Sequence, residues 1–333
     1  MFEGKKILIT GGTGSLGKAL TKRLLKSDVD TVRIFSRNED KQVTMESEIL
    51  DERLRFFIGD VRDFERLTRA LEDIDIVFHA AALKHVPVVE YNPFEAIKTN
   101  VIGSQNVINA CLHEDVELSV AVGTDKAVSP LNTYGATKLL MEKLFVTAQN
   151  YLNPLRHRTK FLSLRYGNVL GSSGSVVPKF IKQIKEKEKI TVTDPEMTRF
   201  SITMDEALDF ILNSTLKGKG SEIFVPKLKA YSVGDVVYAL KELLGNFGEE
   251  KIPIRQGEKI HEVLINVDEM RSTLEDKTTY TIVNTSSVKE EYIISNHPNM
   301  KQVKEIKQYS SDLVEKISKN ELKKLIQNSG LLN

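Results

Sequence analysis

The sequence predicts an α/β protein with a doubly wound parallel sheet and a smaller α/β lobe. Short apolar runs alternate with amphipathic segments from Lys5 onward, which is the pattern of repeated βαβ units. A glycine-rich stretch separates the first apolar run from the first amphipathic segment. The 333 residues are 41 % hydrophobic and 28 % charged, which is enough material for one large domain and a second, smaller one.

The predicted elements follow this alternation along the chain. Six or seven parallel strands are expected, beginning with the runs KILIT, TVRIFSR, LRFFIGDV, DIVFHAAA, LSVAVGT and KFLSLRYGNV. Helices are expected at 18–26, 64–72, about 93–112, about 134–151, 176–187, 204–215 and 318–326. The pattern loosens after Val169, so we expect a first domain over residues 1–170, with some later segments returning to it. A second lobe over 171–280 and a C-terminal extension over 281–333, of undefined structure, complete the predicted organisation.

Composition excludes several classes of protein. Lys and Arg total 47 against 46 Asp and Glu, so no global charge favours nucleic acid or an anionic membrane. The single cysteine, Cys111, excludes internal disulfides and Cys-based zinc sites. His79, His85 and His261 are too scattered to indicate a metal site. No long apolar run indicates a signal peptide or membrane span, and a cytoplasmic location is expected.

The glycine-rich stretch predicts a dinucleotide site on a Rossmann-type domain. It reads TGGTGSLG from Thr10 to Gly17 and fits either GxxGxxG from Gly11 or GxGxxG from Gly12. Such glycines permit a tight turn and let backbone N–H groups approach a pyrophosphate at the helix N-terminus. An ordinary strand-to-helix turn is the alternative, but the strand before and the helix after favour binding.

The residues after the second and third strands bear on the choice of cofactor. Ser36 and Arg37 stand where an NAD-selective site would usually place an acidic residue. Arg37, with Lys41 close behind, could pair with a 2′-phosphate, which favours NADP over NAD. The neighbouring Glu39-Asp40 weakens this signal, and a solvated surface run remains the alternative. Asp60-Val61 could meet the adenine amino group, or Asp60 could be a plain turn residue.

Two polar groups near the fifth strand are candidates for catalysis. Tyr134 and Lys138 are spaced one helical turn apart, and a nearby ammonium is what a phenol needs to act as a base near neutral pH. Thr124, Asp125 and Lys126 follow the strand LSVAVG, at the sheet edge where open α/β sheets bind ligands. Oxidation of an alcohol needs only a base and a hydroxyl, so the added carboxyl and amine indicate a further acid–base step. A surface Tyr–Lys pair and a solvated loop are the alternatives.

Several of these motifs resemble one enzyme family. TGGTGSLG, the Tyr134-x-x-x-Lys138 pair and TDKA resemble the extended short-chain dehydrogenase/reductase superfamily, in its nucleotide-sugar 4,6-dehydratase branch. FFIGDVRD, HAAALKHVP, RYGNV, GSVVP, TRF and GEKIHE resemble the soluble, C5-inverting UDP-N-acetylglucosamine 4,6-dehydratases. The resemblance runs from about Lys5 to Leu264 and fades beyond Asp268.

The resemblance implies a reaction in which NADP is regenerated. Tyr134, helped by Lys138 and Thr124, would take the proton of the sugar 4-hydroxyl as hydride passes from C4 to NADP. Lys126 would then remove the C5 proton, Asp125 would protonate the departing 6-hydroxyl, and the hydride would return to C6. Protonation of the opposite face of C5 would give UDP-2-acetamido-2,6-dideoxy-β-L-arabino-hex-4-ulose, an early intermediate of pseudaminic acid or related surface sugars.

The resemblance also assigns binding residues and an assembly. The implied cofactor residues are Gly11, Thr13, Gly14, Ser15, Leu16, Gly17, Ser36, Arg37, Lys41, Asp60, Val61, Ala81, Lys84, Tyr134 and Lys138. The implied residues for UDP-N-acetylglucosamine or a related UDP-hexosamine are Lys84, Asn168, Arg199, Arg255 and Glu258. Because the net charge is only +1, such arginines must hold the anionic ligand locally. Related enzymes pair through the helix that carries Tyr134, so a homo-oligomer is expected.

Other activities remain open at this point. C5-retaining sugar dehydratases have Glu where this chain has Lys126, and membrane-anchored relatives usually have Met in place of Tyr134. A UDP-sugar 4-epimerase would share the glycine loop and the Tyr–Lys pair but would not need Asp125 and Lys126. A dehydrogenase that consumes its cofactor is a further alternative. A non-catalytic NADP-binding protein is disfavoured because all five candidate catalytic residues are present.

Overall fold

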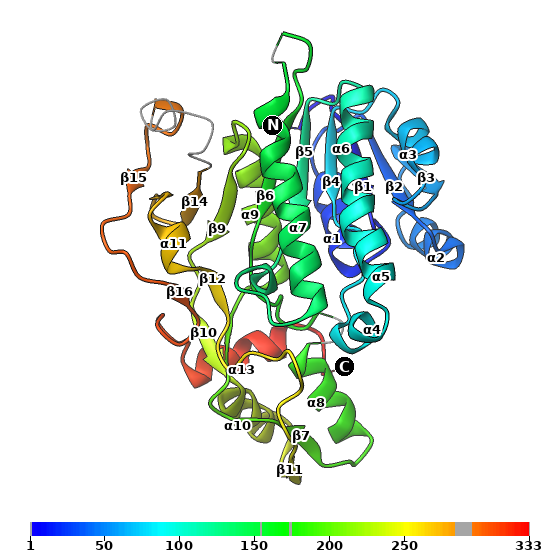
Figure 1. The fold of residues 1–333 in the computed structure, drawn as a ribbon. Helices are drawn as coiled ribbons and strands as arrows, with labels where there is room; N and C mark the ends of the chain where they lie inside the picture. The colour runs from blue at the N-terminus through cyan, green and yellow to red at the C-terminus, as the bar shows by residue number, and fades with distance from the viewer. Residues whose placement is uncertain (1, 154, 173–174, 284–294, 333) are drawn as a thin grey trace.

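A computed structural model of the chain describes residues 2–153, 155–172, 175–283 and 295–332. Within these residues a ten-stranded sheet has the order β15-β13-β14-β9-β6-β5-β4-β1-β2-β3 (Figure 1). Its parallel strands are β1 (Lys6–Thr10), β2 (Thr31–Ser36), β3 (Leu54–Ile58), β4 (Ile76–His79), β5 (Leu118–Val122), β6 (Lys160–Leu164) and β9 (Ile223–Pro226). The predicted doubly wound parallel sheet is therefore confirmed.

An antiparallel edge extends this sheet beyond the predicted strands. It consists of β14 (Thr279–Ile282), β13 (Thr273–Glu275) and β15 (Lys301–Gln302), with β14 paired to β9. Sequence reasoning did not predict this edge, because strands of two to four residues carry little periodic signal. Part of the region for which no structure was predicted, residues 284–294, lies outside the described residues.

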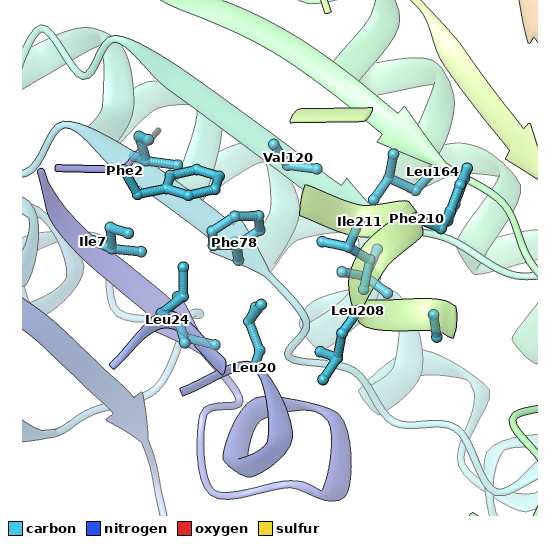
Figure 2. Packing of buried hydrophobic residues seen from close by; sticks show 14 of the residues in the cluster. Phe2, Ile7, Leu20, Leu24, Phe78, Val120, Leu164, Leu208, Phe210 and Ile211 are labelled. Carbon is cyan, nitrogen blue, oxygen red and sulfur yellow. The ribbon is translucent and has the colours of Figure 1, made fainter. Parts of the chain in front are cut away.

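Helices cover both faces of the parallel strands. Ile7 and Ile9 on β1 point to one face and Leu8 to the other, since strand side chains alternate. The first face is covered by α1 (Ser15–Leu24), α2 (Glu39–Glu48) and α9 (Met204–Lys217). The opposite face is covered by α3 (Phe64–Leu71), α6 (Gly103–His113) and α7 (Thr133–Ala148). Figure 2 shows how Leu20 and Leu24 of α1 meet Phe78 of β4 in the first of these layers.

The stretch predicted as one helix from about Pro93 to Leu112 is interrupted. It consists of α5 (Pro93–Ala96), a π-helical turn η1 (Ile97–Ile102) and α6, and is preceded by α4 (Val86–Tyr91). The wider turn brings Asn100 inward, where its side chain bonds both the N–H and the carbonyl of Leu83 at 2.8 and 2.9 Å. This contact fixes the loop after β4, which lines the site described below.

Helix α7 is held against the sheet by a buried ion network. Arg165, which follows β6, donates to both carboxylate oxygens of Glu142 on α7, at 2.5 and 2.6 Å. The same guanidinium reaches Glu269 on α11 (Val267–Met270) at 2.6 and 2.9 Å. Arg165 and Glu142 are fully buried, so removing one partner would leave an uncompensated charge in the core.

The remaining elements form a smaller lobe with a core of its own. It contains α8 (Val176–Lys185), α10 (Val233–Leu244) and α13 (Lys319–Asn328), whose apolar faces pack together. Short strands pair as β7 (Ile190–Val192) with β11 (Glu249–Lys251), β8 (Thr198–Phe200) with β10 (Ala230–Ser232), and β12 (Val263–Ile265) with β16 (Tyr309–Ser310). The end of the chain thus completes the small lobe, and Ser318 caps α13 by accepting the N–H of Glu321.

Candidate active site

The glycine loop forms a floor made of backbone at the carboxyl end of β1. Gly11 has φ +67°, and a Cβ there would lie 2.9 Å from the backbone of Ala81. A Cβ on Gly17 would lie 2.4 Å from the carbonyl oxygen of Gly12, so helix and strand approach too closely for any side chain. Helix α1 begins immediately after Gly14, and its free N–H groups face the same space. This cradle has the shape and the donors that a pyrophosphate requires.

A cavity of about 440 Å³ lies over this floor. Every residue that the sequence assigned to the cofactor lines it. Among its described lining residues Asp60 is the only carboxylate, against the cations Arg37, Lys41, Lys84 and Lys138. Arg37 lies 3.6 Å from Asp60, which is also held by Arg62 at 2.6 Å. The cavity is therefore suited to an anionic dinucleotide.

A buried histidine supports the loop from behind. His79, at the end of β4, bonds the hydroxyl of Thr10 at 2.8 Å and that of Ser104 at 2.9 Å. The Thr10 hydroxyl in turn accepts the N–H of Ala81 at 3.2 Å. Burial lowers the pKa of His79 to about 3, so its ring is neutral at physiological pH. His79 is therefore a hydrogen-bonding residue of the loop.

Thr124, Asp125 and Lys126 lie where β5 ends, in the short turn η2 (Asp125–Ala127). The Thr124 hydroxyl donates to Asp125 Oδ1 at 2.8 Å, and Lys126 Nζ lies 3.1 Å from the same oxygen. Asp125 is fully buried behind its two neighbours and lines neither cavity, whereas Thr124 lines both. Burial acts to lower the pKa of Lys126, but the charges of Asp125 and Glu262 outweigh it and raise this pKa above its usual value.

Tyr134 and Lys138 lie in the first turns of α7, which Asn132 caps by accepting the N–H of Gly135 at 2.8 Å. Lys138 Nζ donates to the carbonyl of Val122 at 2.6 Å, and burial lowers its pKa to about 7. Burial raises the pKa of Tyr134 to about 12, and the charge that opposes this rise comes from Lys126. The expected help of Lys138 to Tyr134 stays a prediction.

A second cavity, of about 900 Å³, opens between α8, the loop after β4 and the segment before β12. All the residues that the sequence assigned to the substrate line it: Lys84, Asn168, Arg199, Arg255 and Glu258. Lys84, Thr124, Tyr134 and Asn168 also line the first cavity, so the two spaces meet beside the candidate catalytic residues.

The two arginines of this cavity differ in how many of their N–H donors are already bonded to the protein. Arg199 is 8 % exposed, and its guanidinium donates to the carbonyls of Thr198, Lys259 and Ile260 at 2.7 to 3.1 Å. Most of its donors are therefore used to hold the segment that carries Glu258 in place. Arg255 is exposed in the cavity, and among the described residues no hydrogen bond or ion pair holds its guanidinium.

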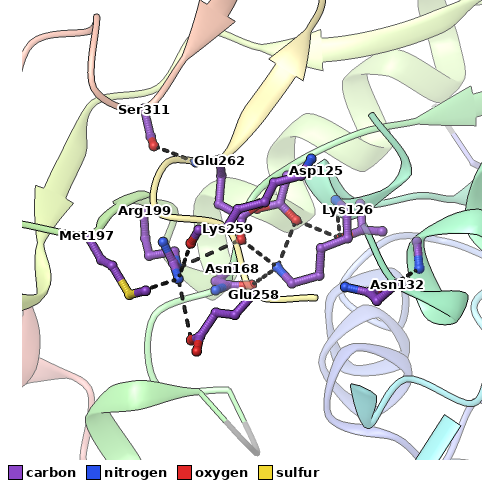
Figure 3. A network of polar contacts seen from close by, with 12 residues as sticks. Asp125, Lys126, Asn132, Asn168, Met197, Arg199, Glu258, Lys259, Glu262 and Ser311 are labelled. Atoms are coloured by element: carbon purple, nitrogen blue, oxygen red, sulfur yellow. Dashed lines mark hydrogen bonds and ion pairs between the residues drawn. The ribbon is translucent and has the colours of Figure 1, made fainter. Parts of the chain in front are cut away.

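Sequence reasoning missed four charged residues that line this cavity: Glu90, Lys179, Lys259 and Glu262. Two of them, Lys179 and Glu262, bear on the chemistry of the site. Lys179 on α8 is bonded to the Thr191 hydroxyl at 2.6 Å, and burial together with the nearby charge of Arg255 lowers its pKa. Glu262 is 3 % exposed and lies 3.2 Å from Lys126 Nζ (Figure 3). The motif GEKIHE contains Glu262 and was the available signal, but the motif alone does not show which of its carboxylates meets the lysine.

The strand order 3-2-1-4-5-6, with a glycine loop and a Tyr–Lys helix at its carboxyl edge, defines the class of protein. It is an α/β protein of the extended short-chain dehydrogenase/reductase type. The chain belongs to the family described as polysaccharide biosynthesis protein, whose model matches residues 7–284. The resemblance drawn from the motifs is thereby confirmed.

Individual relatives carry different names. The chain is 48 % identical over 284 residues to a UDP-N-acetylglucosamine 4,6-dehydratase (inverting) of Campylobacter jejuni, covering 85 % of this chain and 84 % of that one. It is 39 % identical to a UDP-glucose 4-epimerase of Rickettsia felis, covering 98 % and 97 %. The X-ray structure of Pen from Bacillus thuringiensis superposes with a TM-score of 0.91 at 39 % identity and covers 100 % of both chains.

In the described part of the chain, no helix combines the length and apolar character needed to cross a bilayer.

Proposed function

We propose that the protein catalyses the NADP-dependent 4,6-dehydration of UDP-N-acetylglucosamine with inversion at C5. The product would be UDP-2-acetamido-2,6-dideoxy-β-L-arabino-hex-4-ulose, an early step toward pseudaminic acid or related surface sugars. The observation that carries this proposal is the Asp125–Lys126 pair, 3.1 Å apart beside the junction of both cavities. An enzyme that only oxidises and reduces C4 has no use for this second acid–base pair. The name of the Campylobacter relative supports the same reaction.

The cofactor would lie on the glycine floor. Gly11 and Gly17 let the loop pack tightly on itself and on Ala81, because a Cβ at either position would meet backbone atoms within 3 Å. The loop thus presents backbone, rather than side chains, to the pyrophosphate. Arg37 and Lys41 favour NADP, since both cations line the cavity next to Ser36, where an acidic residue would favour NAD. When bound, NADP would accept a hydride from C4 of the sugar and later return it to C6.

Tyr134 would remove the proton of the 4-hydroxyl. Its phenol lines both cavities, and its pKa of about 12 means that it is protonated in the protein alone. The positive charge of an oxidised nicotinamide ring beside it would favour the phenolate, as Lys126 already does. Proton transfer at O4 is thereby linked to the presence of the oxidised cofactor.

Asp125 and Lys126 would perform the elimination. A proton that moves from Lys126 Nζ to Asp125 Oδ1, over 3.1 Å, leaves a neutral amine base and a carboxylic acid. The amine would take the C5 proton. Because Asp125 does not line the cavity, its proton would reach the departing 6-hydroxyl through Thr124, whose hydroxyl lies 2.8 Å away. One proton and one hydroxide leave the sugar as water, and the pair returns to its starting charge.

The diphosphate would be held by Arg255 and Lys179. These two cations lie close enough for one to lower the pKa of the other, and no acidic partner neutralises the lysine among the ion pairs of the described residues. An anion between them would remove this repulsion and form charge-assisted hydrogen bonds with both. Arg199 would act on the substrate through Glu258 and the backbone that it holds.

A 4-epimerase is the second candidate, because the Rickettsia relative bears that name. The two activities are separated by incubating the protein with UDP-N-acetylglucosamine in heavy water without added cofactor and following the sugar by NMR. We expect loss of water, deuterium at C5 and the coupling of an inverted C5. A product epimeric at C4, with all hydroxyl groups retained, would overturn the proposal.

We further propose that the protein is a homo-oligomer. Large apolar side chains are exposed on neighbouring elements on the α7 side of the molecule: Tyr91, Phe94, Ile102 and Leu140. A monomer rarely leaves such a group of side chains in water. Light scattering coupled to size exclusion tests the assembly, and a monomeric mass would contradict it.

A further inference from the structure

We propose that Glu262 is a positioning residue for Lys126: it holds the amine at the C5 proton and stabilises the ammonium that forms there. This inference rests on the proposed dehydration and extends it to a residue that the sequence did not single out. In the step concerned, the C5–H bond breaks and the proton passes to Lys126 Nζ. The electron pair of that bond forms the C5–C6 double bond as the C6–O bond breaks, and the 6-hydroxyl leaves as water with the proton that Asp125 supplies. Glu262 neither gains nor loses a proton.

The first observation is the way the lysine is surrounded. Lys126 Nζ lies 3.1 Å from Asp125 Oδ1, 3.2 Å from Glu262 Oε1 and 3.3 Å from Asn168 Oδ1 (Figure 3). An ammonium has three hydrogens to donate, so these three acceptors match its capacity. A lysine side chain is otherwise flexible, and this arrangement fixes both the place and the direction of its nitrogen.

The second observation is that the buried carboxylate of Glu262 destabilises the fold. Its side chain is 4 % exposed, and its Oε2 is buried without a hydrogen-bond partner among the described residues. Besides Lys126, the nearest cation is Arg199, whose Nε lies 3.7 Å from Oε1. A buried carboxylate with one oxygen unpaired destabilises a fold relative to a well-paired one. Glu262 also lines the second cavity, where the sugar is proposed to bind. The destabilising carboxylate therefore lies next to the part of the substrate that would react.

The third observation is that the backbone of Glu262 is anchored by the C-terminal extension. Its N–H donates to the Ser311 hydroxyl at 2.9 Å, and the Ser311 N–H donates to its carbonyl at 2.8 Å. Ser311 is fully buried and also bonds the Thr198 hydroxyl at 2.7 Å. Residues beyond 280, whose role the sequence left open, thus hold the carboxylate against Lys126.

It follows that Glu262 should affect one step of the turnover, the removal of the C5 proton, and not the oxidation at C4. Tyr134 and Lys138 serve the oxidation at C4, and among the described residues Glu262 forms no hydrogen bond with either of them. Loss of the Glu262 charge should therefore leave C4 oxidation intact and slow the removal of the C5 proton. The enzyme should then hold its cofactor in the reduced form, which absorbs near 340 nm.

The test is a single-turnover experiment on E262Q with UDP-N-acetylglucosamine and bound NADP. We expect the 340 nm absorbance to rise as fast as in the unchanged protein and to decay at least 30-fold more slowly. Deuterium uptake at C5 from heavy water should slow by the same factor, and E262D should recover part of the loss. K126A should also accumulate reduced cofactor, with a slower rise because Lys126 favours the Tyr134 phenolate. E262Q added to K126A should slow the decay no further.

A matched control separates this role from general damage to the cavity. E258Q removes a carboxylate from the same segment, one that faces Arg199 at 3.7 Å and not Lys126, and we expect it to raise KM without accumulation of reduced cofactor. Decay in E262Q as fast as in the unchanged protein, or a further loss when E262Q is added to K126A, would overturn the inference. If the unchanged protein releases no water from the sugar, the proposed function fails instead, so the two failures are distinguishable.

Discussion

The cavity over the glycine loop and the second cavity are built in different ways. They are called the dinucleotide cavity and the sugar cavity here, after the ligands proposed for them. The dinucleotide cavity has a floor of backbone and small residues that come from the continuous segment 11–17, and its long side chains stand at the rim. The sugar cavity is walled by long charged side chains from separate parts of the chain: Lys126, Lys179, Arg199, Arg255 and Glu262. A backbone floor tolerates the loss of any one side chain, whereas a wall of single side chains does not. Truncations in the sugar cavity should therefore have the larger effects.

The largest effect is expected at the boundary of the two cavities. Lys126→Ala removes the proposed C5 base and leaves Asp125 buried without its cation, so dehydration should fall at least 1000-fold, about 4 kcal/mol in activation free energy. NADP should remain bound, because Lys126 does not line the dinucleotide cavity. Product assays together with fluorescence titration of NADPH measure both quantities. Turnover at the normal rate would refute the role given to Lys126.

A smaller effect is expected for the diphosphate. Lys179→Ala should raise KM for the UDP-sugar about 30-fold, the value of a charge-assisted hydrogen bond of about 2 kcal/mol, and change kcat little. Lys182→Ala is the matched control, since Lys182 lies on the same helix with its side chain 73 % exposed. An unchanged KM for K179A, or equal effects of both variants, would contradict the proposal that Lys179 binds the diphosphate.

In the dinucleotide cavity a side-chain deletion should matter less and affect only selectivity. Arg37 is half exposed, so Arg37→Ala should weaken NADP about tenfold and leave NAD unchanged. Calorimetric titration of both cofactors measures the ratio. Arg55→Ala serves as the control, because Arg55 on β3 bonds backbone carbonyls and does not line this cavity. An equal loss for both cofactors would show that Arg37 does not read the 2′-phosphate.

The smallest expected effect concerns the support of the glycine loop. His79 has a folded-state pKa of about 3 against 6.5 when unfolded, so the unfolded chain binds the proton first as the pH falls. The stabilisation is complete above pH 6.5 and is lost progressively below it, by about 1 kcal/mol between pH 7 and 5.5. Denaturant unfolding at several pH values measures this slope, and His79→Gln should flatten it. A slope equal in both proteins would assign the acid sensitivity to other groups.

The same contrast explains what the sequence could predict. The parallel strands and the lining of the dinucleotide cavity follow from local patterns, because period, glycine spacing and strand ends lie within short segments. The π-helical turn at Ile97–Ile102 and the antiparallel strands β13 to β15 depend on distant partners and were not predicted. The roles proposed for Glu262 and Lys179 depend on their proximity to Lys126 and Arg255, which are distant in the sequence. Patterns of residue spacing in the sequence cannot predict such proximity in space.

The central claim is that both cavities serve one internal transfer, from C4 of the sugar to C6, with acid–base chemistry at C5 between the two steps. UDP-N-acetylglucosamine carrying deuterium at C4 tests this most directly, with the position of the label in the product read by NMR and mass spectrometry. We predict that the deuterium appears at C6, in a CH₂D group. Deuterium that returns to C4 of an epimer, or that accumulates in the reduced cofactor, would contradict the account.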